Sequence, residues 1–430
     1  MSKTYCGSCR GERGCADCSA VGKSVVYTGL TDFFAERMMP GTFDGDVTAY
    51  SECKESLQNC DLLLAADLGT PTLAFVCADK EGRILASYGC ENPQRKTAAD
   101  VIGRIDAALH GQAEYLSNAI REALVKGFLF VLHRGEKVLR ETDAEAIGPR
   151  LRIAIAGNTT MQHLLLGYPV AGLAKTPFLP YKTEKEVCKF FELFGKTVAY
   201  NTLPQALKTA EVTVFPCMSA FVGGDVIAGA NVLFADRADE TDRTELLIDL
   251  GTNGELLLSV HGKRYGTAAA MGSAFEGGRY AYASDLFRKI AVAAEQGIMD
   301  ETGLLCEPYF TEGFEGMLQE DVREFQLAKG AIRAGIELLC NHANVTTDQI
   351  NRVFLAGGFG RFCNEEDLFR TGLLPGAFDG KVTVVGNSCI GGLLSYLKNK
   401  ETVIYCEGKV LNLAEQPEFE ELYYRYMNFE

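Results

Sequence analysis

An internal repeat constrains the fold more than any other feature of the sequence. The segment LLLAADLGTPTLAFVCADKEGRIL at 62–85 matches TELLIDLGTNGELLLSVHGKRY at 244–265 in pattern. Each copy reads as a hydrophobic strand, the tetrapeptide Asp-Leu-Gly-Thr, a second strand, a polar turn with glycine and a third strand. Because a repeated supersecondary unit indicates a duplicated architecture, the sequence predicts two similar α/β lobes around a cleft.

Helical and strand patterns alternate outside the two copies of the repeat. Apolar residues at helical spacing predict helices over 97–109 and 113–128, and LRIAIAGN at 151–158 predicts a strand that ends at a glycine turn. Residues 167–215 are less regular and indicate an insertion. RVFLAGGFGRF at 352–362 predicts a strand with glycines at its carboxyl end. This alternation is typical of an α/β fold.

The charge of the chain excludes several classes of partner. The 430 residues carry a net charge of −15. Nucleic acids and anionic membrane surfaces require a basic surface, so we expect neither as a partner. No apolar run approaches the ~20 residues of a membrane span, and the polar N-terminus has no signal-peptide core. We therefore expect a cytoplasmic protein, in which the fifteen cysteines are mostly thiols.

The two Asp-Leu-Gly-Thr turns have the composition of phosphate-binding turns. Glycine lets the backbone approach a ligand closely, and threonine adds a hydroxyl and an N–H group to a nest that attracts anions. The aspartate is repelled by phosphate and is better suited to hold Mg²⁺ or its waters. A single turn of this kind is also what an ordinary hairpin uses. Two copies at equivalent positions of a repeat are much stronger evidence for a phosphate ligand.

Four cysteines near the N-terminus have the spacing of a metal-binding set. They form two C-x-x-C pairs, Cys6 with Cys9 and Cys15 with Cys18. Four thiolates suit an iron–sulfur cluster or a zinc ion. Only residues 10–14 separate the pairs, whereas zinc knuckles are usually ~15–20 residues apart. This favours a single iron–sulfur cluster, with a [4Fe–4S] cluster preferred, and leaves zinc or a thiol redox pair as alternatives.

The motifs, in their order, resemble those of a known ATPase superfamily. Two Asp-x-Gly-Thr turns followed by a strand and AGGFG resemble the phosphate-1, phosphate-2 and adenosine motifs of the actin/Hsp70/sugar-kinase superfamily. The segments 155–167 and 384–397 stand where that superfamily has its two connecting helices. A narrower set is similar to the reductive activators of corrinoid proteins: ENPQRKTAADVIGRI, AGNTTMQHLLLG, FVGGDVIAGA, DLGTNGELLL, TAAAMGSAFEGG, GAIRAGIELL and AGGFGRF. The resemblance covers about residues 61–400 and implies duplicated actin-like (ribonuclease H-like) lobes.

The resemblance also implies an activity. Reductive activators are iron–sulfur ATPases of anaerobic methyltransferase systems, and they return an oxidised Co(II) corrinoid to Co(I). The implied cofactors are ATP, Mg²⁺ and an iron–sulfur cluster. The implied electron acceptor is a corrinoid protein or another low-potential acceptor, and the implied electron donor is a ferredoxin-like protein. A homodimer is compatible with the sequence, which leaves the oligomeric state open. Two alternatives remain: a small-molecule kinase of the same superfamily, which leaves the cysteines unexplained, and a zinc-bearing, nucleotide-sensing adaptor.

Individual positions receive roles from the resemblance. The first phosphate turn would consist of Asp67, Gly69 and Thr70, and the second of Asp249, Gly251, Thr252 and Asn253. The residues under the adenosine would be Gly357, Gly358, Phe359 and Gly360. Asp225, in FVGGD at a glycine-rich helix start, would position or activate the attacking water, and an N-cap aspartate is its structural alternative. Pro71 departs from the family's motif because it removes a backbone N–H that could bond phosphate.

The expected organisation follows from these motifs. Its parts are a Cys-rich module over 1–20, a connector over 21–60, ATPase lobes over 61–240 and 241–400, and an extension over 401–430. Members of the family carry a full ferredoxin domain before the ATPase lobes. The sequence before the first lobe is too short for such a domain, so we expect the Cys-rich module to replace it.

Overall fold

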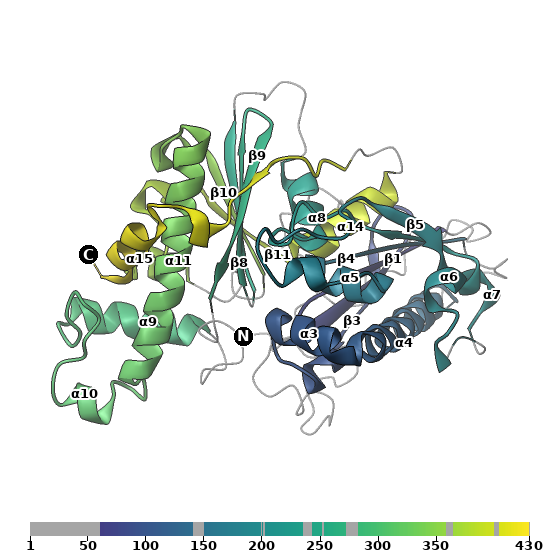
Figure 1. Cartoon of the computed structure of the whole chain (residues 1–430), viewed down its shortest axis with the longest axis horizontal. Coiled ribbons are helices and arrows are strands. Elements are labelled where there is room, and N and C mark those ends of the chain that lie inside the picture. The colour runs from purple at the N-terminus through teal and green to yellow at the C-terminus, as the bar shows by residue number, and fades with distance from the viewer. Residues whose placement is uncertain are drawn as a thin grey trace. The chain divides into compact units, whose positions relative to one another are not determined.

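The computed structural model resolves two compact units (Figure 1). It describes residues 61–140, 150–198, 200, 203–234, 243–251, 253–271, 283–357, 364–399 and 404–429. Within them, the first unit runs to Leu233 and also takes in Asn387–Cys406, and the second unit holds the rest. Each unit has its own buried apolar cluster. The Cys-rich module and the connector expected over 1–60 lie outside the described residues.

The first unit is built on a six-stranded sheet in the order β3-β2-β1-β4-β6-β5. Its strands are β1 (Asp61–Leu68), β2 (Thr72–Ala78), β3 (Ile84–Glu91), β4 (Arg150–Gly157), β5 (Glu186–Lys189) and β6 (Glu211–Val214). Strand β1 pairs antiparallel with β2 and parallel with β4, which in turn pairs parallel with β6. Both β1 and β4 are buried along most of their length, as expected of central strands that are covered on both faces.

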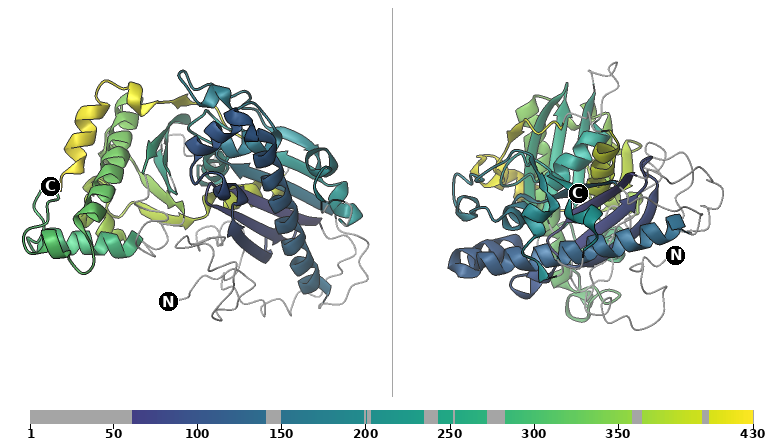
Figure 2. Two further views of the ribbon diagram at one scale, coloured as in Figure 1. Left: turned by 60° about the horizontal axis from the view of Figure 1, so that its bottom comes forward. Right: turned by 90° about the vertical axis from the view of Figure 1, so that its right-hand side faces the viewer.

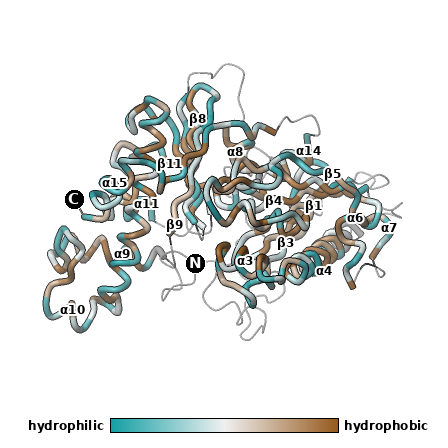
Figure 3. Tube along the Cα trace, in the orientation of Figure 1, coloured by the Kyte–Doolittle hydropathy of each residue, from teal (hydrophilic) through white to brown (hydrophobic). Residues whose placement is uncertain are grey.

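Helices cover this sheet. They are α3 (Val101–Ala107), α4 (Ala113–Arg140), α5 (Thr159–Leu166), α6 (Phe190–Phe194), α7 (Gln205–Lys208), α8 (Gly224–Leu233) and α14 (Ser388–Lys398). The long blue helix in Figure 2 is α4, which packs against β2 and β3, and in Figure 3 its tube alternates between brown and teal. The predicted helices are present, but Leu109 at the end of the first is 50% exposed. Directly after Leu109, the backbone kinks at His110 and Gly111 (φ 90°), so the first helix does not continue straight into α4.

The second unit is built on another six-stranded sheet, in the order β11-β10-β7-β8-β9-β12. Its strands are β7 (Thr244–Leu250), β8 (Asn253–Val260), β9 (Lys263–Ala270), β10 (Arg352–Ala356), β11 (Val382–Gly386) and β12 (Lys409–Val410). Its helices are α9 (Ala283–Glu295), α10 (Tyr309–Glu312), α11 (Gln319–Ala343), α13 (Glu365–Arg370) and α15 (Phe419–Met427). Helix α11 packs on β8 and β9, and α15 lies along α11 (Figure 1). Neither α11 nor any other helix in the described ranges is long and apolar enough to cross a membrane.

The sequence repeat corresponds to a repeat in topology. In each unit, three strands form an antiparallel meander, β1–β2–β3 in the first and β7–β8–β9 in the second. A parallel strand follows beside the first strand of each meander, β4 or β10, and another beside that, β6 or β11. The strand orders β3-β2-β1-β4-β6 and β9-β8-β7-β10-β11 therefore correspond. The predicted duplicated α/β fold is confirmed.

Helix α14 departs from the expected lobe ranges. The range 241–400 would place it in the second lobe, but it belongs to the first unit, where it packs against α8, β1 and β4. Arg152 of β4 donates to the carbonyl oxygen of Leu397 in α14. At Gly392, a Cβ atom would collide with the backbone of Ala228 in α8, so the two helices approach each other as closely as glycine allows. A continuous range therefore does not describe the second lobe.

Candidate functional site

The first Asp-Leu-Gly-Thr turn lies at the carboxyl end of β1. Asp67 is partly exposed, whereas Leu68 and the residues before it in the strand's second half are buried. In register, Asp67 pairs with Ala156 of the parallel strand β4. At Gly69, a Cβ atom would lie 2.7 Å from the carbonyl oxygen of Thr72, so the turn requires glycine. The turn therefore presents one carboxylate at the carboxyl edge of the sheet.

Two asparagines hold the polar side chains of this turn. Nδ2 of Asn158 donates to Oγ1 of Thr70 over 2.8 Å. Nδ2 of Asn387 donates to Oδ2 of Asp67, also over 2.8 Å. Each asparagine is also a helix N-cap, because its Oδ1 accepts from the backbone N–H three residues later, at 3.0 Å in α5 and 2.8 Å in α14. The N-termini of α5 and α14 thus meet the first turn.

Asn158 and Asn387 are not among the residues predicted from the sequence, although the sequence carries a signal for them. Both follow a glycine that ends a strand, in AGNTT and VGNSC. An asparagine directly after the glycine that ends a strand is a signal for a helix N-cap. This signal gives the capping role, but not the contact that each side chain makes with a turn far away in the sequence.

The carboxylate of Asp67 is largely desolvated, although the residue as a whole keeps part of its exposure. Burial raises its pKa, and hydrogen bonds from the side chains of Asn387 and Cys389 oppose the rise. Among the described residues, no lysine or arginine forms an ion pair with it. The described ranges also contain no cluster of three or more His, Cys, Asp or Glu that could hold a metal. The single carboxylate of Asp67 fits Mg²⁺, which usually takes one or two protein carboxylates and completes its shell with phosphate oxygens and waters.

Asp225 lies in the first turn of α8, close to the same corner of the first unit. Its Oδ1 accepts from the N–H of Val226 over 2.8 Å. A Cβ atom at Gly223 would lie 2.7 Å from this oxygen and 2.5 Å from the Cα of Asn158. Asp225 and the asparagine that holds Thr70 are therefore close neighbours of the same glycine. Asp225 is partly exposed.

The second turn repeats this geometry in the second unit. Asp249 is partly exposed near the end of β7 and pairs in register with Ala356 of the parallel strand β10. The residue after β10 is Gly357, with φ at 88°. A Cβ atom there would collide with the carbonyl oxygen of Leu250 and lie 2.8 Å from Oδ1 of Asp249. The strand-end glycine and the second turn are thus in close contact.

The remaining predicted residues divide into two sets. Gly251 donates its N–H to the carbonyl oxygen of Asn253 over 3.0 Å, which closes the second turn, and Asn253 begins β8. The others lie outside the described residues, namely Thr252, Gly358, Phe359, Gly360, Cys6, Cys9, Cys15 and Cys18.

Comparison with known families decides which family the chain is part of. The family described as the RACo middle region matches residues 62–237. The C-terminal domain of RACo, the ASKHA domain, matches residues 243–285 and 316–430. The chain belongs to the RACo family of reductive activators of corrinoid proteins. The two RACo matches include the described site residues of both turns and Asp225, so the predicted family is confirmed.

Individual RACo relatives agree with this assignment. The corrinoid activation enzyme RamQ of Eubacterium limosum is 27% identical over 429 residues, and the match covers 84% of this chain and 69% of RamQ. A solved structure named "Reductive activator for corrinoid,iron-sulfur protein" matches with a TM-score of 0.69 and 23% identity. That match covers 87% of this chain and 67% of the other. The predicted actin-like fold class is confirmed.

Proposed function

We propose that this chain is an ATP-dependent reductive activator, which returns the cobalt of a corrinoid protein from Co(II) to Co(I) in a methyltransferase system. The observation that carries the proposal is the RACo family match across both copies of the repeat. The name of the relative RamQ, a corrinoid activation enzyme, supports the same reaction class.

In this proposal the first turn receives nucleotide phosphates. Asn387 holds the carboxylate of Asp67, and Asn158 holds the hydroxyl of Thr70, so both groups are oriented before a ligand binds. Such preorganisation reduces the entropy lost on binding. A magnesium ion would relieve the desolvated charge of Asp67. ATP, when bound with this ion, supplies a phosphoanhydride bond whose hydrolysis releases free energy.

The second turn and the strand-end glycines have the roles that the family implies. We propose that Asp249, Gly251, Thr252 and Asn253 form the second phosphate turn, and that Gly357, Gly358, Phe359 and Gly360 lie under the adenosine. Support from the described residues is the contact of Gly357 with the second turn. A residue without a side chain at this point keeps the backbone open to a flat ligand.

Asp225 is proposed to position or activate the water that attacks the terminal phosphate. Its place beside Gly223 and Asn158 supports this role, because the same asparagine holds the hydroxyl of the first turn. A general base must lie within hydrogen-bond reach of the proton that it accepts. Water is consumed in this step, ATP gives ADP and phosphate, and a proton is released.

Electron transfer requires a donor and a path. One electron per cobalt is needed, and we propose that a ferredoxin-like protein supplies it. We propose that Cys6, Cys9, Cys15 and Cys18 hold an iron–sulfur cluster, preferably [4Fe–4S], with zinc as the alternative, and that 21–60 connects this module to the lobes. Such a cluster supplies one-electron chemistry when bound. This part of the proposal rests on cysteine spacing alone.

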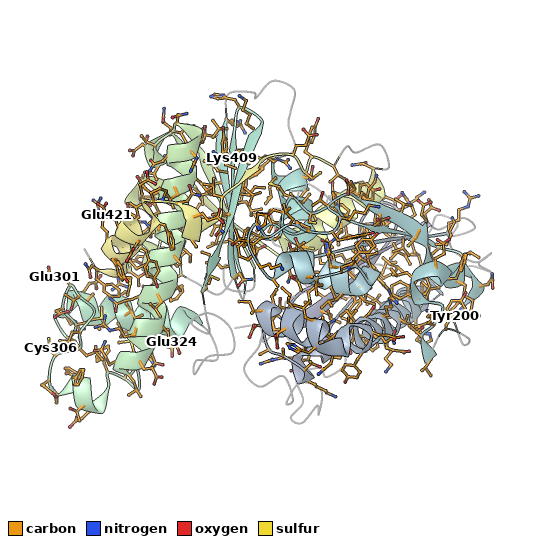
Figure 4. The ribbon with its side chains drawn as sticks, in the orientation of Figure 1. Tyr200, Glu301, Cys306, Glu324, Lys409 and Glu421 are labelled. Carbon is orange, nitrogen blue, oxygen red and sulfur yellow. The ribbon has the colours of Figure 1, made fainter. Side chains whose placement is uncertain are left out.

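Anaerobic purification with iron, sulfide and zinc analysis tests the cluster. We expect iron and sulfide in the wild type and their loss in Cys6→Ser. Cys306, an exposed cysteine labelled in Figure 4, provides the control: Cys306→Ser should keep the full iron content. Zinc in place of iron would overturn the electron-donor role. ATP turnover that depends on a sugar or an acid, and not on a corrinoid protein, would favour the small-molecule kinase.

A further inference from the structure

A buried polar network lies behind the first turn. The carbonyl oxygens of Gly69 and Pro71 both accept from Asn92, one from its Nδ2 and one from its backbone N–H, each over 2.9 Å. Between them, the carbonyl oxygen of Thr70 accepts from Nη2 of Arg104 over 2.6 Å. Three successive carbonyls of the turn are therefore held by one segment of the chain, residues 92–104.

Arg104 is fully buried, with an exposed fraction of 0%. Its Nε donates to the carbonyl oxygen of Ala98 over 3.1 Å. Its Nη1 lies 3.2 Å from Oε1 of Gln94 and 2.9 Å from the sulfur of Met161 in α5. In the part of the chain that the structure describes, no carboxylate forms an ion pair with this guanidinium. Its hydrogen-bond partners are therefore all neutral.

The charged groups around Arg104 do not cancel its charge. Burial has the largest effect on the pKa of Arg104 and lowers it, Asp100 at the N-cap of α3 opposes this, and Arg95 adds to it, so that the pKa falls to about 10. The guanidinium is therefore still a cation at neutral pH. A buried charge with neutral partners alone is costly for folding. Ionisable groups whose pKa is strongly shifted by burial cluster at functional sites.

The guanidinium of Arg104 lies at the peptide that precedes Pro71. The Thr70–Pro71 peptide has no N–H, so the first turn offers one donor fewer to an anion. Arg104 bonds the carbonyl oxygen of this same peptide. The second turn has Asn253 at the position of Pro71 and keeps its N–H. In addition, Asn92 bonds the carbonyl oxygen of the Gly69–Thr70 peptide. Because the C=O and N–H groups of a trans peptide point in opposite directions, the N–H of Thr70 points away from the network.

We propose that Arg104 is a positioning residue that supplies, from behind the first turn, the positive potential that Pro71 removes from its ligand side. Arg104 fixes the turn through the Thr70 carbonyl and attracts the phosphates of a bound nucleotide without touching them. This inference rests on the proposed nucleotide function of the first turn. It predicts that Arg104 contributes to the binding of phosphates and contributes nothing to the binding of the nucleoside.

Calorimetric titrations of ADP and of adenosine, the same ligand without phosphates, separate this role from a structural one. For Arg104→Met we expect ADP affinity to fall on the order of tenfold while adenosine affinity stays unchanged. The matched control is Arg121→Met, because Arg121 is another partly buried arginine that donates to a carbonyl, that of Leu165, over 2.9 Å. This control should leave both affinities unchanged.

Arg104→Lys gives a second readout that does not depend on the methionine variant folding. The same burial will lower the pKa of the introduced amine, so ADP affinity should fall between pH 7 and pH 9. The wild type should bind ADP equally well over this range. Equal losses for ADP and adenosine, or no pH dependence in Arg104→Lys, would overturn the inference. Wild-type protein that binds neither ADP nor ATP would instead overturn the proposed function.

Discussion

Asn387 donates a hydrogen bond to Asp67 over 2.8 Å, although the two residues are 320 positions apart in the chain. The same asparagine caps α14 through its Oδ1. One side chain therefore links the candidate metal-binding carboxylate to the start of a helix that follows β11 directly in sequence. This link gives a physical reason for the membership of α14 in the first unit.

We predict that Asn387→Ala will weaken both the fold and the nucleotide site. Loss of the cap should lower the free energy of unfolding by about 1 kcal/mol, and the lost bond to a carboxylate adds about 1.5 kcal/mol or more. Asn364→Ala is the control, since Asn364 caps α13 through a bond to the N–H of Glu366 and lies on the surface. Urea unfolding and ADP titration should show a loss of ADP affinity in Asn387→Ala alone. Equal ADP affinity in the two variants would contradict the assignment.

Asp67→Asn should stabilise the protein without ligand at neutral pH. Burial raises the pKa of Asp67 in the folded state. The protonated carboxyl therefore stabilises the fold at low pH, and this stabilisation is lost as the pH rises from the ordinary aspartate pKa through the raised pKa of the folded state. The asparagine has no charge to desolvate, and we expect a gain of about 1 kcal/mol at pH 7, within the range of single stabilising substitutions. The gain should vanish near the ordinary aspartate pKa of ~3.9. Lower stability than the wild type at pH 7 in urea unfolding would refute this prediction.

Gly357→Ala should damage the second turn. A methyl group there would collide with Leu250 and approach the Asp249 carboxylate, and φ at 88° is unfavourable for alanine. We expect a loss of about 3 kcal/mol and weaker ATP binding. Gly380→Ala is the matched control, because its φ is 68° but no atom lies within 4 Å of the added Cβ. It should cost only about 1 kcal/mol and leave ATP affinity intact. Similar losses in thermal unfolding for the two variants would show that the contact is unimportant.

Asp225→Asn should reduce ATP turnover by about 100-fold while ATP affinity stays the same, because a general base acts in the chemical step. Asp321→Asn provides the structural comparison. Asp321 lies in the first turn of α11 and accepts from the N–H of Leu318 over 2.7 Å. Its variant should lose stability and keep the wild-type turnover rate. If Asp225→Asn behaves like Asp321→Asn in steady-state kinetics, Asp225 is only a helix-terminal carboxylate.

The sequence predicted the parts of the fold that depend on local patterns. Buried strands followed by Asp-Leu-Gly-Thr identified β1 and β7, and the repeat predicted that the two meanders correspond. The burial of Arg104 was not predictable, because an arginine between the apolar positions of a helix reads as a surface residue. Its partners come from residues 70, 94, 98 and 161, which only the folded chain brings together.

The placement of α14 was also beyond local patterns. Its sequence reads as a helix after β11, but nothing in that stretch shows which sheet it will cover. Helix α14 approaches α8 closely at Gly392, and it contacts β1, where Asn387 also bonds Asp67. Both are long-range interactions. Periodicity and capping signals therefore predict that Ser388–Lys398 form a helix, but they do not predict which of the two units the helix joins.

Reduction of a purified Co(II) corrinoid protein tests the central claim most directly. The full chain is mixed anaerobically with this protein and a low-potential reductant, and Co(I) is followed by its absorbance and by the loss of the Co(II) EPR signal. The account predicts that Co(I) forms when ATP is present, does not form without ATP, and does not form with Asp67→Asn. Co(I) formation at the same rate with and without ATP, or no Co(I) with ATP and wild-type protein, would contradict it.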